Sequence, residues 1–197
     1  MIKQLDELNG NGFVVIKNAL AADKITRLLE ATENLIAKIG ETSSAPPIGF
    51  QKGIANDAIV NNIHYHSDEF LDLAVNGSQI EPIMKVMNDP YYGIIPEGEP
   101  NFCLAQCNLR RSDSVIDYHT DVRLRIPYPL SWSIQCIVAL ENRGERNGGL
   151  KVIPRSHLLS ANEAAKLALE SEIFVDLKAG DMVLFWSHLL HGTADLS

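Results

Sequence analysis

The stretch SWSIQCIVALENRGERNGGLKVI, residues 131–153, decides the fold class of this chain. It contains two short apolar runs, 131–140 and 150–153, with the tight-turn signal Asn147-Gly148-Gly149 between them. Further short runs bounded by turn residues occur at 102–109, 174–177 and 182–186. Several short strands at this spacing are typical of a β-sandwich or a closed β fold.

The residues before this β region predict helices and a single strand. Phe13-Val14-Val15-Ile16 follows Asn11-Gly12 and predicts a short buried strand. The pattern predicts helices over 23–39, from Ser67 onward, and over 81–87, with a loop at 42–53. A short helix over 163–169, capped by Asn162, is also expected. We therefore expect one domain over residues 1–197, with a helical part at 1–100 and a β core at 101–197.

Composition limits the class of partner. The chain has 197 residues, of which 46% are hydrophobic and 21% charged, as in one soluble globular domain. A net charge of -8 argues against nucleic acid or an anionic membrane as the main partner. No run of eighteen apolar residues and no signal-like leader occurs in the sequence. We expect a cytoplasmic protein that acts on a small molecule.

The three cysteines, Cys103, Cys107 and Cys136, predict free thiols. Their number is odd, and three residues separate the first two. Neither a disulfide framework nor a zinc knuckle fits this spacing, and a reducing compartment is the simplest match.

The chemistry of the chain centres on His119-Thr120-Asp121 and on His191, seventy residues after Asp121. In an extended strand, residues two apart point to the same side, so His119 and Asp121 can aim at one point while a distant strand brings His191. Two imidazoles and a carboxylate form the facial triad that holds Fe(II) and leaves other positions open. The same ligands could hold manganese or zinc, and an H-x-D alone also occurs in ordinary surface loops.

The ordered set of motifs resembles the phytanoyl-CoA dioxygenase-like (PhyH) branch of the Fe(II)/2-oxoglutarate-dependent oxygenases. Tyr118-His119-Thr120-Asp121 resembles the H-x-D of that family. The other matching segments are NGFVVIKN at 11–18, NGGLKVIPRSH at 147–157, AGDMVLF at 179–185 and HLLHG at 188–192. The likeness extends from about residue 9 to the end of the chain.

The resemblance implies a mainly β fold, a double-stranded β-helix (the cupin-type jelly roll) with N-terminal helices packed on its outer side. It implies His119, Asp121 and His191 as iron ligands and as the catalytic residues. It also implies 2-oxoglutarate and O2 as cosubstrates. Related halogenases replace the carboxylate with a small residue, so Asp121 favours hydroxylation.

Two positions depart from the family pattern. The arginine that anchors the far carboxylate of 2-oxoglutarate lies roughly ten residues after the distal histidine in the family, whereas this sequence ends six residues after His191. We expect that the natural chain continues, or that a basic residue such as Lys151, Arg123 or Arg125 replaces it. Arg155 stands where the family usually has glycine, so strain or a different loop is expected there.

Other polar residues have competing interpretations. Gln106, Asn108 and Gln135 lie in predicted strands, and we expect them to bind the cosubstrate or the substrate, because buried amides need partners. His157 and His188 fit structural roles better than catalytic ones. His64 and His66 could form a second metal pair, although a solvated loop explains them more simply.

The leading hypothesis is an Fe(II)- and 2-oxoglutarate-dependent dioxygenase that hydroxylates a C–H bond of a small molecule and releases succinate and CO2. Acyl-CoA thioesters, amino acids and natural products are all possible substrate classes within the family. The alternatives are a cupin-fold metal enzyme that does not use 2-oxoglutarate and a non-catalytic jelly-roll binding module.

Overall fold

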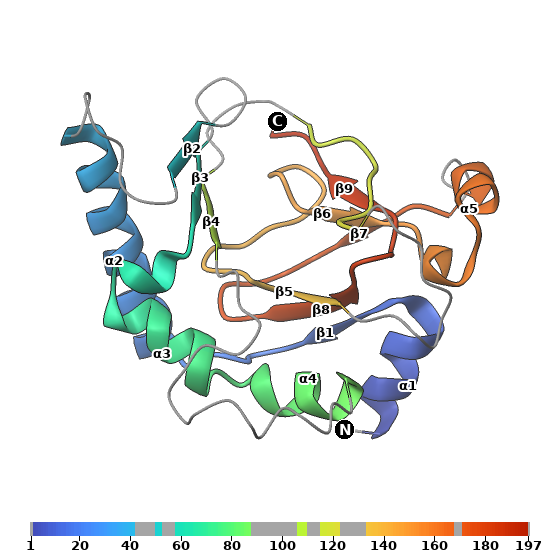
Figure 1. Ribbon diagram of the computed structural model, residues 1–197, viewed down its shortest axis with the longest axis horizontal. Helices are drawn as coiled ribbons and strands as arrows, with labels where there is room; N and C mark the ends of the chain where they lie inside the picture. The colour runs from blue at the N-terminus through green and yellow to red at the C-terminus, as the bar shows by residue number, and fades with distance from the viewer. Residues whose placement is uncertain are drawn as a thin grey trace. The chain divides into compact units, whose positions relative to one another are not determined.

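The computed structural model describes residues 2–41, 50–52, 58–87, 106–109, 115–122, 133–167 and 171–196. The chain divides into two compact units (Figure 1). The first contains residues 1–19, 85–87 and 113–197, and the second contains residues 20–84 and 88–112. We describe each unit by itself.

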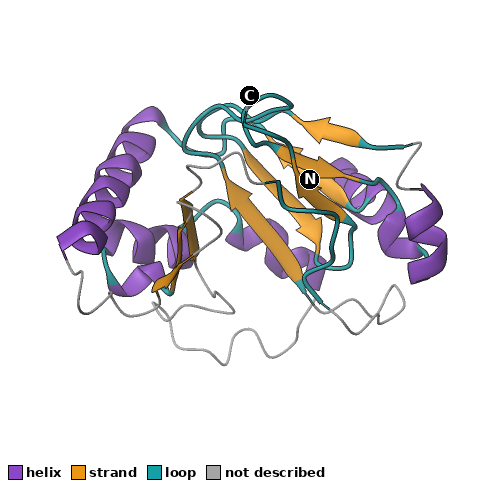
Figure 2. Ribbon diagram, turned by 90° about the horizontal axis from the view of Figure 1, so that it is seen from above, coloured by secondary structure: helices purple, strands orange, loops and turns teal. Residues whose placement is uncertain are grey.

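Two antiparallel three-stranded sheets form the centre of the first unit (Figure 2). One has the strand order β1-β8-β5, from β1 (Phe13–Ile16), β8 (Met182–Trp186) and β5 (Ile134–Val138). The other has the order β7-β6-β9, from β7 (Ile173–Val175), β6 (Leu150–Val152) and β9 (His191–Thr193). The remaining elements are α1 (Ile2–Asn11), the 3-10 helix η3 (Ser156–Leu158) and α5 (Ala161–Leu167).

The hydrophobic core of this unit is built from both sheets. Val183 and Phe185 of β8 pack with Leu150 and Val152 of β6 and with Val175 of β7. Alternate residues of a strand point to opposite faces, so Met182, Leu184 and Trp186 lie on the other face of β8, and they too are buried. Helix α1 packs against β1 and β8. Burial of a side chain such as Phe185 contributes roughly 1.5–3 kcal/mol.

Gly12 joins α1 to β1 at a crowded point. Its φ is +91°, a conformation that favours glycine. A Cβ built there would lie 2.5 Å from His157 Nδ1 and 2.5 Å from Leu189 Cδ1. The Gly12 N–H donates to Leu8 O at 2.9 Å, so the same residue ends the helix. The chain direction and the local packing therefore both require a glycine.

Asp181 ties β1 to the start of β8. Its carboxylate is buried and accepts hydrogen bonds from Lys178 N at 2.8 Å, Asn18 N at 2.9 Å and Lys17 Nζ at 2.9 Å. Three donors on one buried carboxylate explain why an aspartate follows Ala179-Gly180 at this turn.

The second unit combines helices with a third antiparallel sheet. Its helices are α2 (Ala22–Glu41), the 3-10 helix η1 (Ile63–Tyr65) and α3 (Asp68–Asn76). Helix α4 (Ile80–Met87) begins in this unit, and its last three residues belong to the first. The sheet has the order β2-β3-β4, from β2 (Phe50–Lys52), β3 (Ala58–Asn61) and β4 (Gln106–Leu109). Lys24 of α2 joins the helices by contacting Glu69 and Asp72 of α3 at 2.7 Å each.

The predicted helices at 23–39, from Ser67 and at 81–87 are confirmed, and Ser67 caps α3 by accepting from Glu69 N at 3.2 Å. The loop predicted at 42–53 is wrong over residues 50–52, which form β2, and its residues 42–49 and 53 lie outside the described part. The expectation of a single strand before residue 101 is also wrong, because β2 and β3 both form there. These strands pair with each other and with the distant β4, and such pairing leaves little local signal.

Two smaller predictions also differ from the structure. Helix α1 was not predicted from the sequence. Helix α5 begins at Ala161 rather than at Glu163, and the residue that precedes it is Ser160 instead of Asn162. The Ser160 N–H and hydroxyl both donate to Glu163 Oε2, at 3.0 Å and 2.5 Å. A serine followed three residues later by a glutamate is a capping-box pattern.

Cys136 is half-buried in β5 and is not part of a disulfide, while Cys103 and the side chain of Cys107 lie outside what the structure describes. The described part of the chain contains no helix that is both long and apolar enough to cross a membrane. The division of the chain at residue 100 and the cytoplasmic location stay predictions.

Candidate metal centre

His119 and His191 lie directly opposite each other on neighbouring extended segments. The His119 N–H donates to His191 O at 2.8 Å, and the His191 N–H donates to His119 O at 3.0 Å. Further along, Thr193 N donates to Ile116 O at 3.0 Å. The segment 115–121 therefore runs antiparallel beside β9, and this pairing brings two histidines together although they are 72 residues apart in the sequence.

The carboxylate of Asp121 completes the group. Its Oδ1 lies 3.6 Å from His119 Nε2, and its Oδ2 lies 3.7 Å from His191 Nε2. One donor atom from each of the three residues lies within 4.8 Å of the others. The His191 side chain is 8% exposed, that of Asp121 29% and that of His119 42%, so the group is closed on the His191 side and open on the other.

Backbone carbonyls fix which imidazole nitrogen faces the carboxylate. His119 Nδ1 lies 2.9 Å from Asp117 O, and His191 Nδ1 lies 2.9 Å from Leu189 O. A carbonyl oxygen can only accept, so each Nδ1 carries the hydrogen and each Nε2 presents a lone pair. Metal-binding histidines in proteins are oriented in this way. Two neutral imidazoles and a carboxylate fit the donor set for Fe(II).

The two histidines have different electrostatic environments. The interaction of the protonated His119 ring with the Asp121 carboxylate is the main cause that raises the pKa of His119, and burial opposes it. Burial lowers the pKa of His191. His191 is therefore held in the neutral form that binds metals, while a proton competes more strongly for His119.

Residues behind the triad hold Asp121 and His191 in place. The Asp121 N–H donates to Ser187 O at 3.0 Å, and the Ser187 hydroxyl donates to Ser133 Oγ at 2.8 Å. Ser187 is fully buried. The Phe185 ring meets the His191 ring edge-on, with 4.8 Å between the centroids. No sequence motif indicated that Ser133 and Ser187 would support Asp121.

The three residues that the sequence predicted as cosubstrate contacts have different outcomes. Gln135 is paired with Phe185, so both side chains lie on the face of the sheet toward the core, and Gln135 Nε2 donates to Ser187 Oγ at 3.4 Å. Gln106 and Asn108 lie in β4 of the second unit, and their side chains lie outside what the structure describes. The structure therefore connects Gln135 to the residues behind the triad.

Of the basic residues considered as anchors for 2-oxoglutarate, the structure describes only Lys151, and this residue does not lie beside the triad. Arg123 and Arg125 lie outside the described residues. Lys151 lies between the core residues Leu150 and Val152 on β6, so its side chain points to the opposite face of the sheet. His191 is paired with Val152 and shares its face. Lys151 is consequently on the other side of the sheet from the His191 ring.

The remaining histidines lie outside this group. In the described residues, the triad is the only cluster of three or more side chains that could hold a metal ion. His157 is buried, its Nε2 lies 3.0 Å from Asn9 O, and burial lowers its pKa, as expected for a structural role. His188 is also buried, while the half-buried His64 contacts Tyr65 in a tilted arrangement, with 4.3 Å between the ring centroids.

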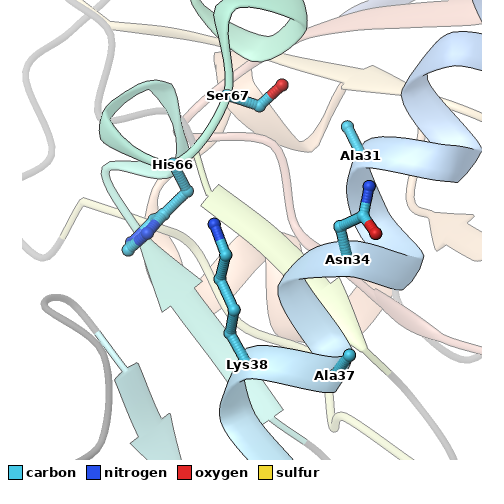
Figure 3. A pocket seen from close by; sticks show the side chains of 6 residues that line it. All are labelled: Ala31, Asn34, Ala37, Lys38, His66 and Ser67. Atoms are coloured by element: carbon cyan, nitrogen blue, oxygen red, sulfur yellow. The ribbon is translucent and has the colours of Figure 1, made fainter.

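A pocket of about 320 Å³ lies within the second unit, between α2 and the start of α3. Its polar lining includes Asn34 and Lys38 from α2, together with His66 and Ser67 (Figure 3). The Ser67 hydroxyl also accepts the capping hydrogen bond of α3.

Comparison with known proteins gives a family and a set of similar folds. The model of the phytanoyl-CoA dioxygenase (PhyH) family matches residues 8–196. HygX from Streptomyces hygroscopicus, solved with nickel and 2-oxoglutarate, is 18% identical with a TM-score of 0.74, covering 99% of this chain and 81% of that chain. EctD from S. alaskensis, solved in its apoform, is 19% identical with a TM-score of 0.74. The match covers 99% of this chain and 71% of EctD.

SnoN from nogalamycin biosynthesis, a non-heme alpha-ketoglutarate-dependent epimerase, is 16% identical with a TM-score of 0.72, covering 100% of this chain and 76% of that chain. No curated protein sequence matches the chain. At these identities the solved structures establish a common fold.

Proposed function

Because the chain belongs to the phytanoyl-CoA dioxygenase (PhyH) family, we propose that it is an Fe(II)- and 2-oxoglutarate-dependent dioxygenase that hydroxylates an unactivated C–H bond of a small molecule. The products from the cosubstrate are succinate and CO2. The observation that carries the proposal is the convergence of His119, Asp121 and His191, with Nδ1 of each imidazole held by a backbone carbonyl and Nε2 left to bind a metal ion.

The two sheets of the first unit are the walls of a double-stranded β-helix in this proposal. The core residues lie between β1-β8-β5 and β7-β6-β9, as a jelly roll requires, and α1 packs on the outer side of the first sheet. The common fold with HygX and EctD supports the assignment. The triad then lies where segment 115–121 meets β9.

Three groups of this chain bind the metal in the proposed mechanism: the Nε2 atoms of His119 and His191 and the carboxylate of Asp121. When bound, Fe(II) supplies the reaction of 2-oxoglutarate with O2 that oxidises the substrate. Phe185 and Ser187 close the side behind His191 and Asp121, whereas the more exposed His119 leaves the opposite side accessible to the cosubstrate and the substrate. The protein thus determines which positions around the ion remain available.

Gln135 is proposed to contact the cosubstrate. Its side chain is half-buried, lies on the core face of β5 beside Phe185 and reaches Ser187. Gln106 and Asn108 keep the same proposed role from their positions in the sequence. An amide can donate and accept at once, so it suits a carboxylate or a bound water equally well.

The substrate is proposed to be a small organic molecule, namely an acyl-CoA, an amino acid or a natural product. HygX has been solved with hygromycin B, and EctD with 5-hydroxyectoine, which supports a small polar molecule. SnoN is an epimerase and SnoK a carbocyclase, so relatives of this fold also direct the oxidation to other outcomes. Hydroxylation is the outcome that Asp121 favours over halogenation.

An anaerobic titration tests the proposal directly. Fe(II) and then 2-oxoglutarate are added to the apoprotein while the visible spectrum is recorded, with Asp121→Ala as the control. We expect a metal-to-ligand charge-transfer band in the wild type alone, followed by succinate formation when O2 and a substrate are supplied. Iron binding without a band would favour a metal enzyme that does not use 2-oxoglutarate. Absence of iron binding would favour the non-catalytic binding module.

A further inference from the structure

Three side chains meet on the outer face of the sheet β7-β6-β9, opposite the His191 ring. The Tyr118 hydroxyl donates to Glu172 Oε2. Lys151 Nζ lies 3.7 Å from the same oxygen and 4.5 Å from the centroid of the Tyr118 ring. We call Tyr118, Lys151 and Glu172 the outer clamp. It joins the segment before His119 to β6 and to the residue that precedes β7.

The outer clamp depends on a glycine in β9. Lys151 is paired with Gly192, the residue after His191. A Cβ on Gly192 would lie 3.1 Å from Lys151 Cε and 2.6 Å from Ile116 O. Because Gly192 has no side chain, the lysine stem can lie over β9 and bring its ammonium group to Tyr118 on the far side. His191 thus supplies a metal ligand on one face of β9, and Gly192 leaves space for the Lys151 side chain on the other face.

The two charged groups of the outer clamp are partly shielded from solvent, and their charges are opposite. The Lys151 side chain is only 18% exposed, and that of Glu172 is 33% exposed. A cation over an aromatic face and beside a carboxylate gains from both contacts when it is partly removed from water. Lys151 therefore has a defined location, and that location is away from the cosubstrate side of the sheet.

Among the described residues, segment 115–121 has few other attachments. It is an edge segment in the described structure. Hydrogen bonds of Ile116 and His119 hold it to β9, and the Asp121 N–H donates to Ser187 O in the turn after β8. Side chains alternate along an extended segment, so fixing Tyr118 outward also fixes the direction in which His119 points inward. A small rotation at Tyr118 would move His119 Nε2 relative to Asp121 and His191.

We infer that Lys151, acting through Tyr118, is a positioning residue that sets the direction of the His119 imidazole toward the metal. The inference rests on the proposed function, since it requires the triad to bind a metal ion. It gives Lys151 a different role from that of a cosubstrate anchor, for which the sequence made it a candidate. Groups behind metal ligands typically change metal affinity by about 10–100-fold when removed.

Cobalt(II) is a suitable probe because its visible spectrum reports both affinity and ligand geometry. Lys151→Met keeps most of the stem and removes the charge, and Tyr118→Phe keeps the ring and removes the hydroxyl. We expect each variant to bind Co(II) at least roughly 10-fold more weakly than wild type and to change the d–d bands. Lys151→Arg should restore part of the affinity. Lys166→Met, at an exposed position of α5, is the matched control and should behave as wild type.

The possible outcomes separate the two claims. Wild-type affinity and spectrum in both Lys151→Met and Tyr118→Phe would overturn the positioning role, as would loss of 2-oxoglutarate binding with unchanged Co(II) affinity. Absence of Co(II) binding by the wild type would overturn the proposed function and the positioning role together. If Lys151→Met does not fold, Tyr118→Phe decides the question alone.

Discussion

His119 and His191 exchange two backbone hydrogen bonds, with N···O distances of 2.8 Å and 3.0 Å, and their rings lie 4.3 Å apart between centroids. The triad therefore depends on the strand register as well as on side-chain contacts. A shift of one residue in segment 115–121 would turn His119 to the outer face and Tyr118 to the inner face. Substitutions of a metal ligand that preserve this register should therefore remove metal binding while the protein still folds.

His191 and His188 provide a matched pair for that separation. Both are buried and lie three residues apart, but only His191 directs a nitrogen toward Asp121. His191→Ala should abolish Fe(II) and Co(II) binding, whereas His188→Ala should retain the metal site and lose stability through the cavity it leaves. Metal titration followed by optical spectroscopy, together with urea unfolding of the apoproteins, checks both parts. Equal loss of metal binding in the two variants would contradict the assignment of His191.

Metal affinity should depend on pH through His119. Its pKa is raised, chiefly by Asp121, so protons compete with the metal at a higher pH than for a free imidazole. Affinity should fall as pH drops through that pKa. Asp121→Asn should lower the pKa of His119, because it removes the main cause of the shift. NMR titration of the His119 ring in the apoprotein measures the pKa directly, and an unchanged pKa in Asp121→Asn would contradict this explanation.

The raised pKa of His119 also affects the stability of the apoprotein. Through this residue, acid weakens metal binding but favours the folded state. A histidine whose pKa is raised in the folded state stabilises the fold below the unfolded-state pKa, and this contribution disappears as pH rises through the folded-state pKa. His191, whose pKa is lowered by burial, instead opposes folding when the pH falls below its unfolded-state value. Acid should therefore weaken metal binding while the contribution of His119 to the stability of the folded apoprotein is retained.

The sequence predicted the parts of the molecule whose signals are local. Phe13–Ile16, Met182–Trp186 and the helix after Ser67 have apolar patterns or caps that determine them within a few residues. The triad residues were found because ligands two apart on a strand form a recognisable pattern. The turn at Asn147-Gly148-Gly149 was also expected, but it joins strands of different sheets and does not form a hairpin between them.

The remaining features depend on contacts between distant residues, which a single sequence does not encode locally. Ser187 supports Asp121 through its backbone carbonyl, an atom that every residue type has. The sequence makes Lys151 a candidate for the cosubstrate anchor, but its pairing with Gly192 determines which face of the sheet it occupies. Strand β9 is only three residues long, and its pairing with β6 sets its limits more than its composition does.

Arg155 adopts a backbone conformation that is expected to be strained. Its φ is +66°, in the left-handed region that favours glycine. That conformation costs a non-glycine residue roughly 1–2 kcal/mol, and glycine loses about 0.5–1 kcal/mol through the entropy of the unfolded chain. Arg155→Gly should thus increase the free energy of unfolding by about 0.5–1 kcal/mol, measured by urea denaturation. Arg155→Ala, which keeps the strain, should give no such gain, and equal stability of the two variants would exclude strain at this position.

Gly12 and Gly10 should respond to alanine in opposite directions. Gly12 has a φ of +91°, and a Cβ there would lie 2.5 Å from both His157 and Leu189. Gly10 lies in α1, and a Cβ there would meet nothing within 4 Å. Gly12→Ala should destabilise the protein by more than about 2 kcal/mol, since it combines backbone strain with overpacking. Gly10→Ala should stabilise it by roughly 0.5–1 kcal/mol, because alanine favours the helix.

Urea unfolding of the two alanine variants beside wild type measures both changes in one experiment. Because Gly12 packs against His157 and Leu189, and Leu189 O orients the ring of His191, Gly12→Ala should also weaken Co(II) binding. Gly10→Ala should leave Co(II) binding unchanged. A Gly12→Ala protein with wild-type stability would mean that α1 and β1 are joined by a different backbone conformation.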